Sequence, residues 1–228
     1  FMWRKSYNIR YALIDGLLCI FSKHGTGAET VNFPIGNGDI TPVFEKLSKY
    51  FTENNQRFLM RVYSKEDIEL INTLYPDTFI FTQDRDSFDY VYKVRELIEL
   101  QGSKYHAKKN HINRFIANYH FEYKEISDEL IPLCYEMFAK WCDSKVDVIE
   151  NISEQREAVS ELLHNYGQLG VTGGAIMVDG KMVAFSFGEV LSEDNSVVVI
   201  HLEHADTDFQ GSFPIMNQQF LENQWHTF

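Results

Sequence analysis

Long apolar runs are absent from this sequence of 228 residues. Its most hydrophobic stretches, such as residues 196–202, are far shorter than the roughly 20 residues that a membrane-spanning helix requires. The chain also does not open with the basic and then apolar segments of a secretory signal peptide. We therefore expect a cytoplasmic protein without a membrane span.

Cysteines are few, and their spacing excludes two kinds of site. Cys19, Cys134 and Cys142 form no CxxC pair, and three thiols cannot build a disulfide framework. We expect them to be reduced and partly buried, as is usual for a cytosolic protein.

Basic residues are in deficit, with 21 Lys and Arg against 33 Asp and Glu and a net charge of −12. A surface of this kind repels phosphate backbones over most of its area. The composition therefore excludes a general nucleic-acid binder, although it still allows a local basic patch.

The residues that are present indicate a globular α/β protein, because 44% are hydrophobic and 14% aromatic. In the second half, periodicity and turn residues predict strands at 121–126, 174–178, 182–190 and 196–205 and helices at 127–141, 153–168 and 212–224. Asp179-Gly180 is the preferred two-residue hairpin turn. The predicted order is β-α-α-β-β-β-α.

The first half repeats part of this pattern. Asp15-Gly16 closes a hairpin, and a helix follows that is capped by Thr41 and has Pro42 in its first turn. The predicted strands are 11–14, 17–23, 29–35, 57–63, 78–82 and 89–93, and a second helix covers 64–74. We interpret the chain as two copies of one unit, residues 1–95 and 96–228. The alternative is that hairpin-plus-helix segments simply recur in α/β folds.

The second copy is expected to be truncated at its C-terminal end. The first copy continues beyond its helix, whereas only four residues follow the helix at 212–224. By analogy, roughly 35–40 residues are lacking. The strand at 196–205 is then expected to have an open edge or to be covered by a partner chain.

Several motifs resemble one family. Residues 100–115 read LQGSKYHAKKNHINRF, and further matches are Gly173-Gly174-Ala175, Val183-Ala184-Phe185 and Glu203-His204-Ala205-Asp206. Nearly the whole chain resembles the family of the phosphatidylglycerol lysyltransferase C-terminal domain (DUF2156). The resemblance implies two tandem GNAT-like (N-acyltransferase) units, with mixed, mostly antiparallel sheets flanked by helices. It also implies transfer of an aminoacyl group from a charged tRNA to a lipid or peptide amine or hydroxyl. The polar Asn-Arg-Glu-type strand with which the family continues is absent here.

The basic helix that starts near Lys104 is the first candidate substrate site. Helical projection places Lys108 and Lys109 at the edges of its apolar face, whereas Lys104 points away from that face. One interpretation is a solvated basic face with snorkelling stems. The other is an anion site for a phosphate or a tRNA acceptor end. The candidate substrate-binding residues here are Lys104, Tyr105, Lys108, Lys109, Asn110 and Arg114.

The loop before the last helix contains further substrate-binding candidates. Gly211 lies where acetyl-CoA-dependent GNAT enzymes have a glycine-rich loop that binds pyrophosphate at a helix N-terminus. Asp206 and Asp208 would repel a diphosphate there, so ordinary CoA binding is disfavoured. These carboxylates suit the amino group of an aminoacyl donor, or they merely cap the helix. The shorter Gly36–Asp39 loop is better explained as a plain strand-to-helix connection than as a phosphate site.

Glu203 is the candidate catalytic residue. Simple alternation places it on the strand face of His201, Val199 and Val197, where burial would raise its pKa and fit it to take a proton from an attacking amine. An exposed strand-end glutamate is the alternative. His201 and His204 point to opposite faces of a regular strand, so no metal site is expected.

We therefore predict an acyl- or aminoacyltransferase. Its donor would be aminoacyl-tRNA or acyl-CoA, and its acceptor a small molecule, a lipid or a peptide. No other cofactor is implied. The alternative is a non-catalytic binding or regulatory module of the same fold. The two are distinguished by whether Glu203 lies beside the Lys108 and Lys109 helix edge.

Overall fold

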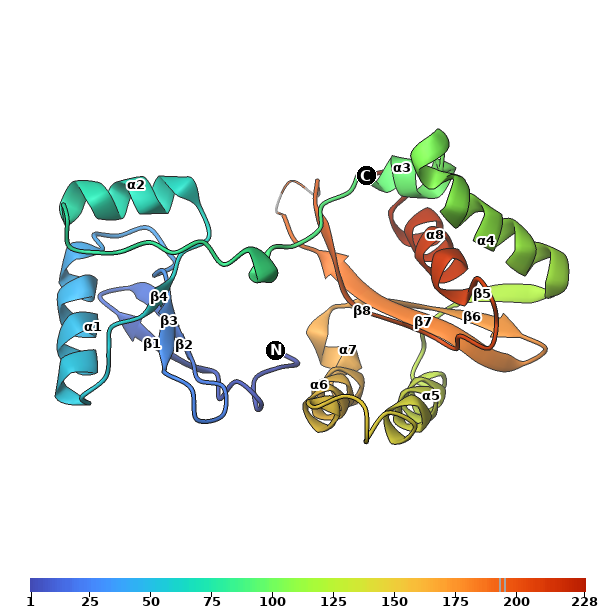
Figure 1. Cartoon of the computed structure of the whole chain (residues 1–228), viewed down its shortest axis with the longest axis horizontal. Helices are drawn as coiled ribbons and strands as arrows, with labels where there is room; N and C mark the ends of the chain where they lie inside the picture. Colours follow the sequence, from blue (N-terminus) through green and yellow to red (C-terminus); the bar gives the residue numbers. More distant parts are fainter. Residues whose placement is uncertain (193, 195) are drawn as a thin grey trace. The chain divides into compact units, whose positions relative to one another are not determined.

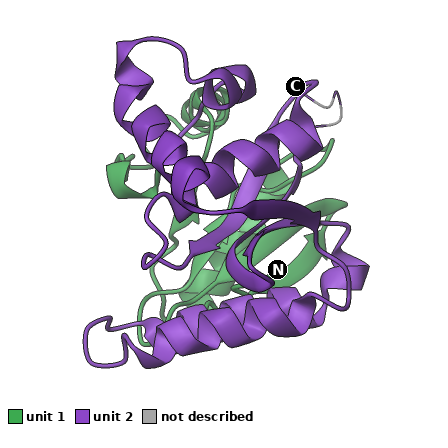
Figure 2. Cartoon of the chain, turned by 90° about the vertical axis from the view of Figure 1, so that its right-hand side faces the viewer, with its two compact units in different colours: residues 1–88 green, residues 89–228 purple. Residues whose placement is uncertain are grey.

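The structure is a computed structural model that describes residues 1–192, 194 and 196–228. The chain forms two compact units, Phe1–Phe88 and Asp89–Phe228, which are coloured separately in Figure 2. Each unit combines a four-stranded sheet with helices, so the expected mixed α/β class is confirmed. The assignment of a partial GNAT-like copy to residues 1–95 and of a second, truncated copy to residues 96–228 stays a prediction.

The first unit has the strand order β1-β2-β3-β4. These strands are β1 (Arg10–Ile14), β2 (Leu17–Ser22), β3 (Thr30–Asn32) and β4 (Met60–Arg61). β1, β2 and β3 pair antiparallel, and β3 pairs parallel with β4. The predicted hairpin turn is confirmed, because Asp15 and Gly16 both have positive φ, 50° and 83°.

Two helices, α1 (Thr41–Glu53) and α2 (Lys65–Leu74), pack on one face of this sheet. Alternation along β2 directs Leu17, Cys19 and Phe21 into that core, where they meet α1 residues such as Leu47. Leu18, Ile20 and Ser22 point to the opposite face, which these two helices do not cover. This second face carries the cavity considered below.

The second unit has the strand order β5-β6-β7-β8, antiparallel throughout. The strands are β5 (Phe121–Glu125), β6 (Thr172–Val178), β7 (Lys181–Val190) and β8 (Val198–Ala205). Asp179 and Gly180, again both at positive φ, close the β6–β7 hairpin as predicted. Within the described residues, β5 and β8 are the two edge strands of this sheet.

Helices cover both faces of the second sheet (Figure 1). On one side lie α3 (Val94–Glu99), the short 3-10 turn η2 (Ser103–Tyr105), α4 (His106–Asn118) and α8 (Ser212–Trp225). On the other side lie α5 (Ile131–Asp143), α6 (Ile152–His164) and α7 (Tyr166–Leu169). The resulting element order is the predicted β-α-α-β-β-β-α, with α7 as a short addition.

Glycines allow α8 to approach the sheet closely. A Cβ on Gly174 would lie 2.8 Å from the Phe220 ring, and one on Gly188 would lie 2.6 Å from Trp225. Real Cβ atoms do not approach other atoms this closely, so both sites require a residue without a side chain. This tight packing holds α8 against β6 and β7, next to β8, where the candidate catalytic residue lies.

A β-bulge reverses the expected side-chain alternation of β8. Phe187 pairs with Leu202, whereas its neighbour Gly188 pairs with Ile200, so His201 is an extra residue in the ladder. Glu203 therefore shares its face with Ile200 and Val198, which pack on the α8 side. The prediction that Glu203 shares a face with His201, Val199 and Val197 is wrong for this reason.

Other local predictions in the first half are also wrong. Residues 78–82 and 89–93 form no strand, because no neighbouring strand supplies partners for their backbone groups, and the predicted strand at 57–63 is reduced to β4. The short 3-10 turn η1 (Arg85–Ser87) lies between them. Thr41 is the first residue of α1 and not its cap, and its N–H donates instead to Asp39 Oδ1 at 2.9 Å. Within the described residues, no helix combines the length and apolarity needed to cross a bilayer.

Candidate functional site

Glu203 lies on β8 and faces α8, with its carboxylate beside a polar residue of that helix. Asn217 Nδ2 donates a hydrogen bond to Glu203 Oε2 at 3.1 Å. No described residue donates to the other carboxylate oxygen, Oε1. One acceptor of a partly buried carboxylate is therefore available to a ligand.

The environment of Glu203 shifts its proton affinity in the direction expected of a base. Burial raises the pKa of Glu203 above its usual value, because removing water penalises the charged form. The hydrogen bond from Asn217 and the positive charge of Lys108 both act in the opposite direction. The net shift is upward, so this carboxylate binds a proton more readily than an exposed one.

Asn217 was not anticipated from the sequence. Its Oδ1 is buried and has no hydrogen-bond partner among the described residues. A buried, unpaired polar atom is costly, and such atoms are few in native proteins. A sequence-level indication existed, because Asn217 lies one turn before Phe220 and Leu221, two buried apolar residues of the same helix.

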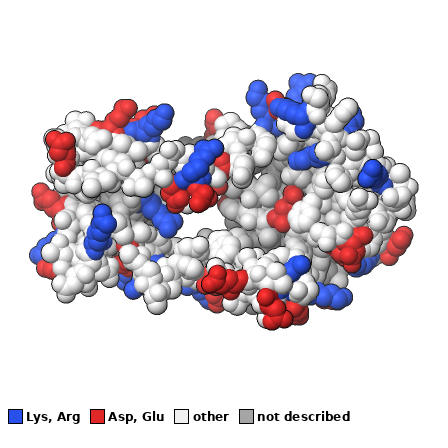
Figure 3. Space-filling model, in the orientation of Figure 1, with Lys and Arg blue, Asp and Glu red and all other residues white. Residues whose placement is uncertain are grey.

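Lys108, on α4, is the residue of the basic helix that lies near Glu203. It is half-buried, makes no hydrogen bond or ion pair with the described residues, and acts electrostatically on the Glu203 carboxylate. Lys109, Asn110 and Arg114 are exposed and lie away from it. On the face shown in Figure 3, Lys and Arg side chains gather over the α3 and α4 region. The structure thus brings Glu203 and Lys108 together and leaves the other basic residues at the surface.

Lys104 and Tyr105 are engaged with a carboxylate of α3. Lys104 Nζ lies 2.7 Å from Glu96 Oε2, and the Tyr105 hydroxyl donates to the same oxygen at 2.9 Å. The Lys104 ammonium also lies 4.8 Å from the centre of the Tyr105 ring. Both side chains therefore connect η2 to α3, and neither points to Glu203.

The acidic loop before α8 is occupied by interactions of its own. Asp206 Oδ2 accepts from Lys181 Nζ at 2.9 Å, and Asp206 Oδ1 accepts from the Asp208 N–H at 3.1 Å. These bonds lower the pKa of Asp206 although its partial burial acts against them. The carboxylate of Asp208 is exposed. Asp206 is thus already paired with a cation of the chain.

Gly211 lies against α4 and leaves little space at the N-terminus of α8. It has a φ of +96°, and a Cβ there would lie 2.5 Å from the carbonyl oxygen of His111. The position thus requires glycine both for its backbone conformation and for close packing. A carbonyl oxygen at this place is also unfavourable for a bound diphosphate.

The two histidines of β8 have separate environments. His204 is buried between the rings of Phe138, Trp141 and Phe185, at centroid distances of 5.2, 5.2 and 5.6 Å. His201 Nε2 lies 2.7 Å from Glu189 Oε1. Among the described residues, no group of three or more His, Cys, Asp or Glu side chains is arranged to hold a metal ion.

Comparisons with known proteins agree with this fold. The family profile described as phosphatidylglycerol lysyltransferase, C-terminal, matches residues 1–228. A crystal structure of a conserved protein of unknown function from Bacteroides thetaiotaomicron is 34% identical, with a TM-score of 0.89 over 98% of this chain and 75% of that chain. The C-terminal domain (DUF2156) assigned to a lysylphosphatidylglycerol synthetase of Agrobacterium fabrum has a TM-score of 0.60 at 12% identity, over 97% of this chain and 69% of that chain. A search of curated proteins found no match.

Proposed function

The chain belongs to the family of the phosphatidylglycerol lysyltransferase C-terminal domain, and from this premise we propose that it is an aminoacyltransferase whose proton acceptor is Glu203. The observation that carries the proposal is the Glu203–Asn217 pair. It presents a carboxylate oxygen and a buried amide oxygen, both without a partner among the described residues. The free carboxylate oxygen fits an attacking group that has a hydrogen to donate, such as an amine.

The reaction requires few protein groups, because the ester of the donor is already activated. The amine or hydroxyl of the acceptor bonds to the carbonyl carbon of the donor, and the ester bond between the aminoacyl group and the tRNA breaks. The proton lost by the acceptor moves to Glu203, which then passes a proton to the leaving tRNA oxygen, so that a hydroxyl is released and the carboxylate is restored. Asn217, which donates to Oε2, would hold the carboxylate so that its other oxygen, Oε1, receives the proton of the acceptor.

Lys108 has two roles in this proposal. Its positive charge favours the ionised form of Glu203, since it opposes the rise in pKa that burial causes. Its ammonium group also has no partner among the described residues, so it is available to an anionic part of the donor. The exposed Lys109 and Arg114 extend the same basic surface along α4 and suit the phosphates of an acceptor end.

The loop before α8 favours aminoacyl-tRNA over acyl-CoA as the donor. CoA would place its diphosphate at the helix N-terminus, where the carbonyl of His111 and the side chain of Asp206 are both oxygen acceptors. An anion there would face negative partial charges and would find few free N–H groups. A donor bound through the surface of α4 avoids this conflict.

The experiment is a transfer assay with the full chain, charged tRNA and phosphatidylglycerol vesicles or a small amine as acceptor. Lysyl- and alanyl-tRNA are compared as donors. We expect Glu203→Gln to lower kcat by about 100-fold or more, the usual contribution of a general base. Glu189→Gln, which removes a carboxylate facing His201, is the matched control and should retain activity. Equal rates for Glu203→Gln and wild type would exclude Glu203 as the proton acceptor. Donor binding without turnover by the wild type would favour a non-catalytic module.

A further inference from the structure

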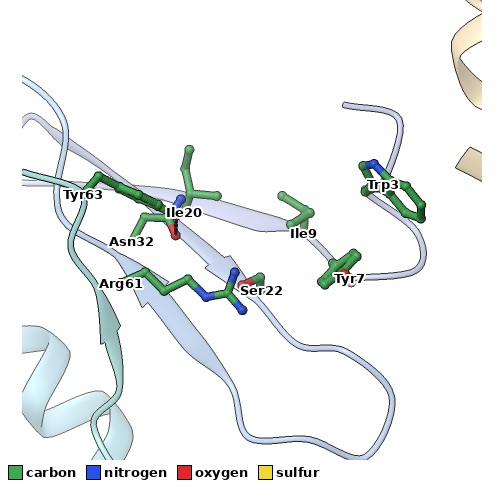
Figure 4. A pocket seen from close by; sticks show the side chains of 8 residues that line it. All are labelled: Trp3, Tyr7, Ile9, Ile20, Ser22, Asn32, Arg61 and Tyr63. Carbon is green, nitrogen blue, oxygen red and sulfur yellow. Dashed lines mark hydrogen bonds between the residues drawn. The ribbon is translucent and has the colours of Figure 1, made fainter. Parts of the chain in front are cut away.

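The first unit has a cavity that none of the residues of the Glu203 site lines. It has a volume of about 270 Å³ and lies on the face of the sheet that α1 and α2 leave open (Figure 4). The side chains that line it are Trp3, Tyr7, Ile9, Ile20, Ser22, Asn32, Arg61 and Tyr63. Several of these side chains lie on one face of the sheet because residues that pair across neighbouring strands point to the same side. Ser22 pairs with Thr30, and Asn32 pairs with Arg61.

The cavity is cationic. Arg61 is the only ionisable lining residue that is charged at neutral pH, and no Asp or Glu lines the cavity. The Arg61 guanidinium group has no hydrogen bond or ion pair with any described residue. Its fork of N–H donors fits a carboxylate or a phosphate.

Asn32 adds a second donor beside Arg61. The Tyr63 hydroxyl donates to Asn32 Oδ1 at 3.1 Å, and this bond fixes the amide so that Nδ2 is the group left without a partner among the described residues. Figure 4 shows Asn32 and Tyr63 at one end of the cavity and the Arg61 guanidinium group directed toward Ser22. An anion between Arg61 and Asn32 would meet donors from both.

The other end of the cavity is aromatic. Trp3 meets Tyr7 edge-to-face, with ring centroids 6.0 Å apart, and Tyr7 stacks on His24 at 4.8 Å. Trp3 keeps 38% of its surface exposed, so part of its ring is available for contact. With Ile9 and Ile20, these rings form an apolar wall next to the donors.

We propose that this cavity binds a small aromatic anion, with a single carboxylate or phosphate held by Arg61 and Asn32 and the ring packed against Trp3 and Tyr7. The volume, at the low end for ligand sites, suits a small molecule. Cations and zwitterions are disfavoured, because no acidic side chain would match a positive group. The proposal does not depend on the transferase activity, since none of its residues belongs to the Glu203 site.

The test is calorimetric titration of the full chain with probes that separate charge from ring. Phenyl phosphate and phenylacetate carry both features and distinguish a phosphate from a carboxylate ligand. Benzyl alcohol has the ring alone, inorganic phosphate the anion alone, and 2-phenylethylammonium the opposite charge. We expect saturable binding of at least one aromatic anion, and much weaker binding of the three other probes.

Two variants place the binding in the cavity. Arg61→Met should weaken binding of the aromatic anion by about tenfold or more, the effect of losing charge-assisted hydrogen bonds. Arg57→Met, an exposed arginine of the same unit that does not line the cavity, should leave it unchanged. Trp3→Leu should also weaken it, while the circular dichroism spectrum stays that of the wild type. Equal effects of the Arg61 and Arg57 variants, equal binding of the ammonium probe, or no saturable binding at millimolar concentration would each overturn the proposal.

Discussion

Protonation of His204 should make the second unit sensitive to acid, and the size of the effect follows from its surroundings. Burial among aromatic rings lowers the pKa of His204 from 6.5 to about 4, because the charged imidazolium is poorly solvated there, although the Asp206 charge acts weakly in the other direction. The unfolded chain therefore binds this proton at a higher pH than the folded one. Stability is unaffected above pH 6.5 and is lost as the pH falls from 6.5 to about 4.

The magnitude is the pKa difference multiplied by about 1.4 kcal/mol per pH unit, which gives a loss of about 3 kcal/mol. The assay is urea unfolding at pH 7, 6, 5 and 4, followed by tryptophan fluorescence in a Trp3→Phe background. The remaining tryptophans, Trp141 and Trp225, both lie in the second unit. His204→Leu should remove most of this loss, whatever its effect at pH 7.

The deciding quantity is the difference in the free energy of unfolding between wild type and His204→Leu. Carboxylates that titrate in the same range affect both proteins alike and cancel in this difference. This difference should change by about 3 kcal/mol between pH 7 and pH 4. His120→Leu, at an exposed position, controls for the loss of a surface histidine. A difference that stays constant with pH would refute the assignment of His204 as a buried neutral group.

Two further predictions concern the contact of α4 with the Glu203 site. Gly211→Ala should lower the free energy of unfolding by about 1–3 kcal/mol in urea titrations, because it strains the backbone and meets α4. Gly167→Ala, which has open space around it within α7, should change stability by less than about 1 kcal/mol, and equal losses would contradict the argument. Lys108→Ala should weaken binding of an acceptor-stem RNA minihelix by about tenfold in anisotropy titrations. Lys104→Ala should have a much smaller effect because Glu96 already pairs with that lysine, and similar losses would indicate a diffuse surface.

The sequence predicted those features that depend on short stretches of chain. Asp15-Gly16 and Asp179-Gly180 define their hairpins, because two successive residues at positive φ restrict the turn to one geometry. The order of elements in the second unit followed from hydrophobic periodicity. The sequence left open whether Lys108 lies beside Glu203. Helical periodicity placed Lys108 at the edge of the apolar face, but it did not specify how that helix packs.

The remaining features depend on contacts that pattern alone does not specify. Residues 78–82 and 89–93 have strand-like alternation but no partner strand, and pairing is a non-local property. The bulge at His201 changes the face of Glu203, yet it is visible only in the register with β7. Asn217 became a candidate only because its amide meets Glu203 across two elements, with its other oxygen left unpaired.

The most direct test of the account is the pH dependence of kcat/KM for aminoacyl transfer in wild type and Lys108→Met. If Glu203 is the base, activity rises with pH as its carboxylate ionises, and the midpoint lies above the usual glutamate value of about 4.3. Removing the positive charge of Lys108 raises the pKa of Glu203, so the midpoint should move to higher pH in the variant. An acid limb that stays in place in Lys108→Met, or that persists in Glu203→Gln, would contradict the assignment of this pair as the catalytic site.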